Sequence, residues 1–87
     1  MNKATREAIE HGCPMRWEMD PASAVGRLNL VATTYTYENG NVRSRTLHRT
    51  HDPIAALRLS DDIKALGGRL EGKSPSDLYA RWQEGIE

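Results

Sequence analysis

The dipeptide Asn39-Gly40 constrains the fold of this chain most strongly, because it follows a segment rich in Leu, Val, Thr and Tyr and precedes a second segment that continues the strand pattern. The first segment ends near Tyr37, and the second begins at Val42. A tight type I′ turn needs positive φ at both of its central residues, and Asn-Gly adopts such angles at low cost. The sequence therefore predicts a β-hairpin over residues 27–50.

A two-residue turn also determines which residues of the hairpin face each other. It places Tyr37 opposite Val42, and the pairing then continues in steps of two along both strands. The further expected pairs on that face are Tyr35 with Ser44, Thr33 with Thr46 and Val31 with His48. The other face is expected to carry Arg43, Arg45 and Arg49 in one row. Since a shift of one residue moves a strand's side chains to the other face, the sequence leaves the register open.

Periodicity predicts the remaining elements. Strict alternation of apolar and polar side chains predicts a strand over residues 15–20, followed by a small-residue connection over 22–26. Apolar residues at helical spacing predict three helices, over residues 3–11, 53–66 and 75–85. Residues 1–87 then form a small single α+β domain in the order helix, three strands, helix, helix. The expected architecture is a three-stranded antiparallel sheet with the helices packed on one face.

Residues 67–74 read GGRLEGKS and match the nucleotide-binding P-loop pattern GxxxxGK[ST]. A P-loop follows a strand, and its backbone N–H groups lead into a helix that binds phosphate. Here the preceding segment has helical spacing, and Pro75 has no N–H to donate. We therefore interpret the string as the end of one helix followed by the N-terminal cap of the next. Gly67 would end one helix, and Ser74 would cap the next, with Pro75 at its first position and Asp77 as its acidic third residue.

Charge and composition restrict the class of protein. Twelve Lys and Arg balance twelve Asp and Glu, and zero net charge argues against binding nucleic acid chiefly by neutralising phosphates. The single cysteine, Cys13, excludes an intramolecular disulfide and is typical of a reducing compartment. The segment from Met1 to Glu7 lacks the apolar core of a signal peptide, and no apolar run approaches the roughly 20 residues that span a bilayer. We therefore expect a cytoplasmic protein without membrane partners.

Positive charge is nevertheless concentrated in the middle of the chain. Residues 21–51 contain Arg27, Arg43, Arg45 and Arg49 against Glu38 alone. Only 38% of residues are hydrophobic and Phe is absent, so the expected core is small. Pairing with a second copy or with another protein would bury more apolar surface, which keeps a homodimer among the expected assemblies.

No group of residues has the spacing of a catalytic or metal site. Zinc could use His11, Cys13, His48 and His51. However, residues three apart on a strand point to opposite faces, so His48 and His51 would not converge. His11 and Cys13 are close in sequence, but no rigid element positions them as a catalytic pair. We therefore expect no enzymatic activity, no cofactor and no metal.

The hairpin carries the best candidate surface, because Arg and Tyr are enriched at protein interfaces. The predicted partner-binding residues are Arg43, Arg45, Arg49, Tyr35 and Tyr37. The sequence favours a small non-enzymatic protein–protein interaction module. Small motif-poor domains of this kind are common among phage and mobile-element accessory proteins, including inhibitors or modulators of host complexes such as nucleic-acid-processing defence systems.

The alternative is a DNA- or RNA-binding regulator. The arginine row could follow a nucleic-acid backbone as a β-ribbon. Residues 73–82 are also loosely similar to the recognition helix of excisionase-like helix-turn-helix proteins, although the preceding connection exceeds the usual three- or four-residue turn. For this alternative the predicted contact residues are Arg27, Arg43, Arg45, Arg49, Lys73, Ser76 and Arg81. The sequence does not decide whether the hairpin faces protein, nucleic acid or solvent.

Overall fold

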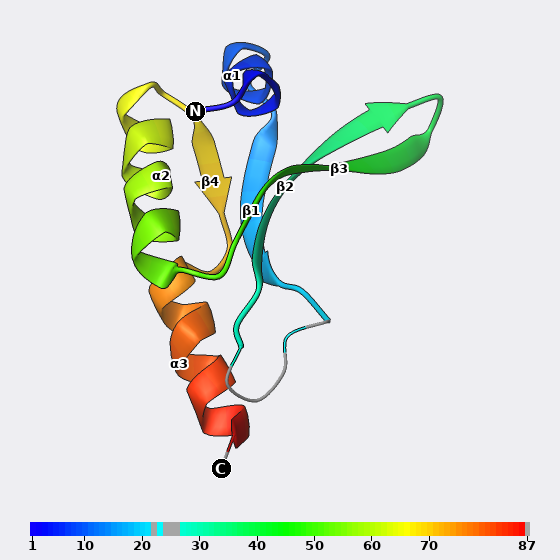
Figure 1. Cartoon of the computed structure of the whole chain (residues 1–87). Helices are drawn as coiled ribbons and strands as arrows, with labels where there is room; N and C mark the ends of the chain where they lie inside the picture. The colour runs from blue at the N-terminus through cyan, green and yellow to red at the C-terminus, as the bar shows by residue number, and fades with distance from the viewer. Residues whose placement is uncertain (22, 24–26, 87) are drawn as a thin grey trace.

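The computed structural model describes residues 1–21, 23 and 27–86, so the predicted connection over 22–26 lies almost entirely outside the described residues. The fold is a small α+β arrangement of three helices and a four-stranded sheet (Figure 1). The elements are α1 (Lys3–Glu10), β1 (Pro14–Met19), β2 (Leu30–Glu38), β3 (Asn41–Thr50), α2 (Pro53–Ala65), β4 (Arg69–Glu71) and α3 (Pro75–Ile86). Except for β4, each element lies close to a range predicted from the sequence.

The hairpin of β2 and β3 forms around the predicted turn. Asn39 and Gly40 both have positive φ, 51° and 79°, as a type I′ turn requires. Near this turn the predicted register is confirmed, with Tyr37 opposite Val42, Tyr35 opposite Ser44 and Thr33 opposite Thr46.

The predicted pairing of Val31 with His48 is wrong, because β3 contains a β-bulge. Thr33 pairs with Thr46 and Ala32 with His48, so Leu47 is an extra residue between them. Its side chain is buried in the core and only 4% exposed. Beyond the bulge the register is shifted by one, and Arg49 faces Val31. Arg49 therefore lies on the opposite face of the sheet from Arg43 and Arg45, and the predicted single arginine row does not form.

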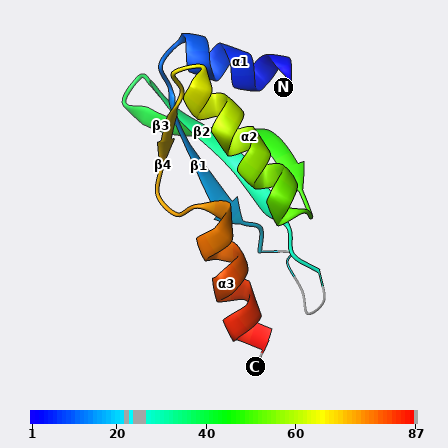
Figure 2. The same ribbon diagram turned by 90° about the vertical axis from the view of Figure 1, so that its left-hand side faces the viewer.

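The sheet has four strands in the order β3-β2-β1-β4, which corrects the predicted three-stranded antiparallel sheet. The added strand, β4, runs parallel to β1, with Met15 opposite Leu70. Parallel neighbours need a long crossover, and α2 provides one as it carries the chain from β3 to the far edge of β1. Figure 2 shows α2 lying over one face of the sheet. The order of elements is therefore helix, three strands, helix, strand, helix.

The P-loop-like string, residues 67–74, ends α2, forms the short strand β4 and then caps α3. Gly67 has φ 82°, its N–H donates to the Lys64 carbonyl at 3.0 Å, and the Gly68 N–H donates to the Ile63 carbonyl at 2.8 Å. This pair of bonds is a Schellman motif, which ends α2 as predicted. At the other end, the Asp77 N–H donates to Ser74 Oγ at 3.2 Å, and the Ser74 N–H donates to Asp77 Oδ2 at 3.4 Å. This reciprocal capping box begins α3.

The core lies between the sheet and the helices. The sheet contributes buried residues from the face that includes Trp17, Leu30 and Ala32, and all three helices add at least one buried side chain. The largest core members are Met15, Trp17, Leu28, Leu30, Leu47, Ile63 and Leu78. Trp17 Nε1 donates a hydrogen bond to Ser60 Oγ on α2 at 2.8 Å, which satisfies the only polar atom of the buried indole. None of the described helices is long and apolar enough to cross a membrane.

Candidate functional site

The distal half of the hairpin, residues 35–44, projects beyond the rest of the sheet and is called here the outer hairpin (Figure 1). It projects because β1 is shorter than β2. Pairing between them ends at Met15 and Thr34, and within the described part of the chain no further residue of β2 has a strand neighbour on that side. The outer hairpin is therefore held mainly by its own two strands, and both of its faces are accessible.

The register divides the predicted partner-binding residues between these two faces. Arg43 lies opposite Thr36 and Arg45 opposite Thr34, so both arginines are on the side of the sheet that faces the helices. Tyr35 and Tyr37 are on the other side, which no described helix covers. Because of the bulge, Arg49 is on that side as well. The five predicted residues thus surround the hairpin and do not form one flat patch.

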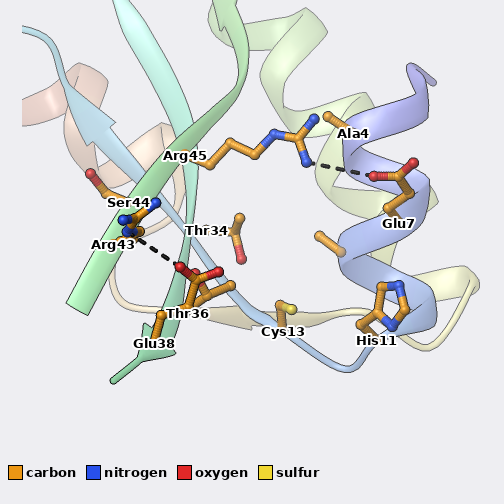
Figure 3. Close-up of a pocket in the computed structure, with 11 residues that line it drawn as sticks. Ala4, Glu7, His11, Cys13, Thr34, Thr36, Glu38, Arg43, Ser44 and Arg45 are labelled. Atoms are coloured by element: carbon orange, nitrogen blue, oxygen red, sulfur yellow. Dashed lines mark ion pairs between the residues drawn. The ribbon is translucent and has the colours of Figure 1, made fainter. Parts of the chain in front are cut away.

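On the helix side, α1 and the outer hairpin enclose a groove of about 480 Å³ (Figure 3). Two ion pairs stand along it. Arg45 Nη1 lies 3.5 Å from Glu7 Oε2 on α1, and Arg43 Nε lies 3.4 Å from Glu38 Oε2 across the hairpin. Small side chains and a thiol line the space between these pairs, among them Ala4, Ala8, Cys13 and Thr36. The groove is therefore largely apolar, and the charges along it are compensated.

On the other side, a layer of side chains crosses the sheet. The Tyr35 hydroxyl donates to Glu18 Oε1, and the Arg16 guanidinium lies 5.4 Å from the centroid of the Tyr35 ring. A smaller hollow of about 290 Å³ adjoins this layer, lined in part by Pro14, Tyr35 and Tyr37. This layer orders Tyr35 and leaves the tip of the hairpin beyond it exposed.

The tip carries an apolar pair. Tyr37 is 80% exposed, and Val42, its cross-strand neighbour, is 57% exposed.

The sequence interpretation omitted Val42, although the predicted register already placed it beside Tyr37. It also omitted Glu7 and Glu38 as arginine partners. The pairing of Glu38 with Arg43 could have been inferred from their closeness on the hairpin, whereas Glu7 comes from a helix whose position the sequence does not determine.

Each of the three predicted hairpin arginines is paired with a carboxylate. Besides Arg43 and Arg45, Arg49 forms an ion pair with Asp20, and the three side chains remain 62–72% exposed. Exposed pairs of this kind contribute little to stability, typically about 0–1 kcal/mol. Their consequence is electrostatic, because the local positive charge that the sequence indicates is largely compensated by neighbours brought in by folding.

The residues of the nucleic-acid alternative are spread over the molecule. Arg27 Nη2 lies 3.2 Å from His51 Nε2 at the base of the hairpin. Lys73, Ser76 and Arg81 are exposed on α3 or just before it, and Figure 1 shows α3 at the opposite end of the molecule from the outer hairpin. The Asp77 carboxylate stands at the start of that helix. The structure therefore does not gather these seven residues into one basic surface.

The histidines and the cysteine considered for zinc are also separated. His11 and Cys13 line the groove, whereas His51 Nδ1 lies 3.2 Å from the Leu28 carbonyl at the base of the hairpin. His48 lies on β3 opposite Ala32. No group of three or more His, Cys, Asp or Glu side chains among the described residues could hold a metal ion.

These features define a small α+β domain with a projecting hairpin that is accessible on both faces. Comparison with known proteins gives no match to a family model, a curated protein or a solved structure.

Proposed function

We propose that this chain is a small non-enzymatic protein–protein interaction module that contacts its partner through the outer hairpin. The observation that carries the proposal is the contrast between compensated charge and exposed apolar surface. Arg43, Arg45 and Arg49 each have a carboxylate partner, while Tyr37 and Val42 at the tip remain mostly exposed.

This contrast favours a protein partner over nucleic acid. Binding to phosphates gains affinity by releasing counterions from uncompensated Lys and Arg. Here each hairpin arginine would exchange a carboxylate for a phosphate, which reduces that gain. Tyr37 offers a large apolar ring with a hydroxyl at its end, a combination enriched at interfaces. An exposed apolar pair on a projecting hairpin can also enter a recess of a partner without moving the core.

The proposal includes the kind of partner and the compartment. We infer a cytoplasmic role in which the module, as an accessory protein of a phage or mobile element, inhibits or modulates a host complex such as a nucleic-acid-processing defence system. Small size and the absence of a catalytic group in the sequence support this role. Identification of the partner is therefore the first experiment.

The test is affinity purification from the source organism, with nuclease treatment and washes at physiological salt. We expect a protein to be retained, and we expect Tyr37→Ala to weaken its binding about thirtyfold, as for an interfacial tyrosine worth about 2 kcal/mol. Arg43→Ala should have a smaller effect, because this charge is exposed and already paired. The affinities are measured by calorimetry with the purified partner.

Duplex DNA and RNA provide the control. We expect weak binding at physiological salt and little change in Arg43→Ala or Arg45→Ala. A steep dependence of log affinity on log salt concentration that becomes flatter in both variants would overturn the proposal in favour of the nucleic-acid alternative.

A further inference from the structure

The inner edge of the outer hairpin exposes main-chain hydrogen-bonding groups. In a two-residue hairpin the residues next to the turn form a hydrogen-bonded pair, and hydrogen-bonded pairs then alternate along the strands. Since Glu38 lies opposite Asn41, the main chains of Glu38 and Thr36 face β3. The N–H and C=O groups of Tyr35 and Tyr37 therefore face the other way, toward the line of β1.

Strand β1 stops where these groups begin. Its last pair with β2 joins Met15 to Thr34, so Pro14 would come opposite Tyr35. Proline has no N–H and cannot donate to the Tyr35 carbonyl. Opposite Tyr37 there is no strand in the part of the chain that the structure describes. The Tyr35 carbonyl and both main-chain groups of Tyr37 thus form a short open edge, at which a further strand can pair.

A hollow adjoins this edge on each face of the hairpin. The groove of about 480 Å³ on the helix side includes Thr36, and the hollow of about 290 Å³ on the other side includes Tyr35 and Tyr37. Successive side chains of a strand point to opposite faces. A strand added to the edge would therefore direct alternate side chains toward the groove and toward the hollow, which is the arrangement by which strand addition combines affinity with specificity.

We propose that this edge binds an extended segment of a partner protein as an added strand in line with β1. The segment pairs with the Tyr35 carbonyl and with the main chain of Tyr37. Its side chain on the helix side is uncharged and small or apolar, because the arginines and glutamates along the groove already compensate one another. The space between them is lined by alanines, two threonines and the Cys13 thiol. The inference rests on the proposed function and names the chemistry of the partner.

A second copy of the chain fits this edge less well. Antiparallel pairing of two such edges would bring the copy's own Thr36 and Glu38 to the helix side, where the groove already contains Glu7 and Glu38. The overlap would also be limited to residues 35–38, roughly 13 Å of strand. That is short for a symmetric interface, which usually buries at least about 1,200 Å². A partner peptide pairs over the same short edge, but it can place an uncharged side chain on the helix side and needs no symmetric interface.

The probe is a peptide selected on the purified protein from a display library of random linear dodecapeptides and then synthesised. Two variants at one position separate the side chain of Tyr37 from its main chain. Tyr37→Ala removes the ring and keeps the N–H, whereas Tyr37→Pro also removes the N–H that faces the open edge. Because this N–H faces away from β3, the hairpin ladder is preserved in both variants, which circular dichroism verifies.

We expect Tyr37→Pro to bind the peptide about five- to tenfold more weakly than Tyr37→Ala, the loss that corresponds to one main-chain hydrogen bond. In the wild-type protein, saturating peptide should slow hydrogen exchange of the Tyr37 amide at least tenfold and leave that of Thr36, which already faces β3, unchanged. The exchange measurement does not depend on the folding of the proline variant.

Each other outcome overturns the inference in a recognisable way. Equal affinity of the two variants together with an unprotected Tyr37 amide would mean that the peptide binds through side chains alone. If no peptide is selected while a folded partner is retained by the outer hairpin, the strand-addition mode fails and the proposed function stands. Absence of both peptide and partner removes both proposals. Concentration-dependent protection of the Tyr37 amide with a dimer mass in sedimentation would identify a second copy as the occupant.

Discussion

Gly68→Ala is expected to lower the free energy of unfolding by about 2–3 kcal/mol, the range of a severe overpacking substitution. An added Cβ would lie 2.4 Å from Ile63 Cγ2, 3.0 Å from the Ile63 carbonyl oxygen and 3.1 Å from Met15 Cε. Ile63 and Met15 are almost completely buried, so neither can move away freely. The chain must shift where it leaves α2, and this shift also displaces the start of β4. Urea denaturation followed by circular dichroism measures the change.

Gly85→Ala is the matched control. Gly85 lies in α3, and nothing stands within 4 Å of the position of its added Cβ. Alanine is the better helix former, so this variant should be as stable as the wild-type protein or more stable by about 0.5 kcal/mol. Equal stability of the two alanine variants would contradict the close approach of Gly68 to Ile63 and Met15.

This part of the chain illustrates what the sequence could not predict. The helix-ending role of Gly67 and the cap formed by Ser74 and Asp77 follow from local chemistry, and both are present. The residues of β4 alternate polar, apolar, polar, but three residues are too few for alternation to distinguish a strand from a loop. They form a strand because α2 carries them to the open side of β1. A strand that forms because of its position in the tertiary structure is difficult to recognise from its own residues.

The hairpin shows the same limit within one element. Asn39-Gly40 determined the register as far as Thr33 and Thr46, since turn geometry acts on the nearest pairs. The bulge at Leu47 was not predictable, because it arises where that side chain enters a core whose shape depends on the helices. One inserted residue then transferred Arg49 to the other face. The register predicted from the turn is therefore wrong beyond Leu47, where burial of this side chain in the core outweighs regular pairing of the strands.

For the candidate surface, the sequence indicated residue types but not their environment. Tyr35, Tyr37 and the arginines do lie on or next to the projecting hairpin. Their surroundings depend on contacts between distant segments, such as Glu7 with Arg45. In the sequence, the excess positive charge of residues 21–51 favours nucleic-acid binding. In the folded protein, ion pairs with carboxylates compensate much of this charge and weaken that interpretation. Contacts of this kind, and the open edge beside Pro14, follow from how β1, β2 and α1 end relative to one another.

Ser60→Ala is expected to lower the free energy of unfolding by about 2 kcal/mol, although it deletes a single oxygen atom. Ser60 Oγ accepts the hydrogen bond of Trp17 Nε1 in the buried core. Without this acceptor the indole N–H remains buried and unsatisfied, and such a group costs about 1–3 kcal/mol. Alanine otherwise suits the interior of α2 better than serine, so the loss can be attributed to the hydrogen bond. Thermal and urea unfolding measure it, with exposed Ser76→Ala as the control near zero.

A double-mutant cycle assigns the effect to the pair. Trp17→Phe removes the donor, so Ser60→Ala in that background leaves no unsatisfied N–H and should change the free energy of unfolding by less than about 0.5 kcal/mol. The remaining bond from Ser60 Oγ to the Ala56 carbonyl, 2.9 Å long, stays within one helix. Bonds of that kind add little to helix stability. If Ser60→Ala lowers the free energy of unfolding as much in the Trp17→Phe background as in the wild-type protein, the hydrogen bond to the indole is not the cause of the loss. The link between β1 and α2 would then rest on apolar packing alone.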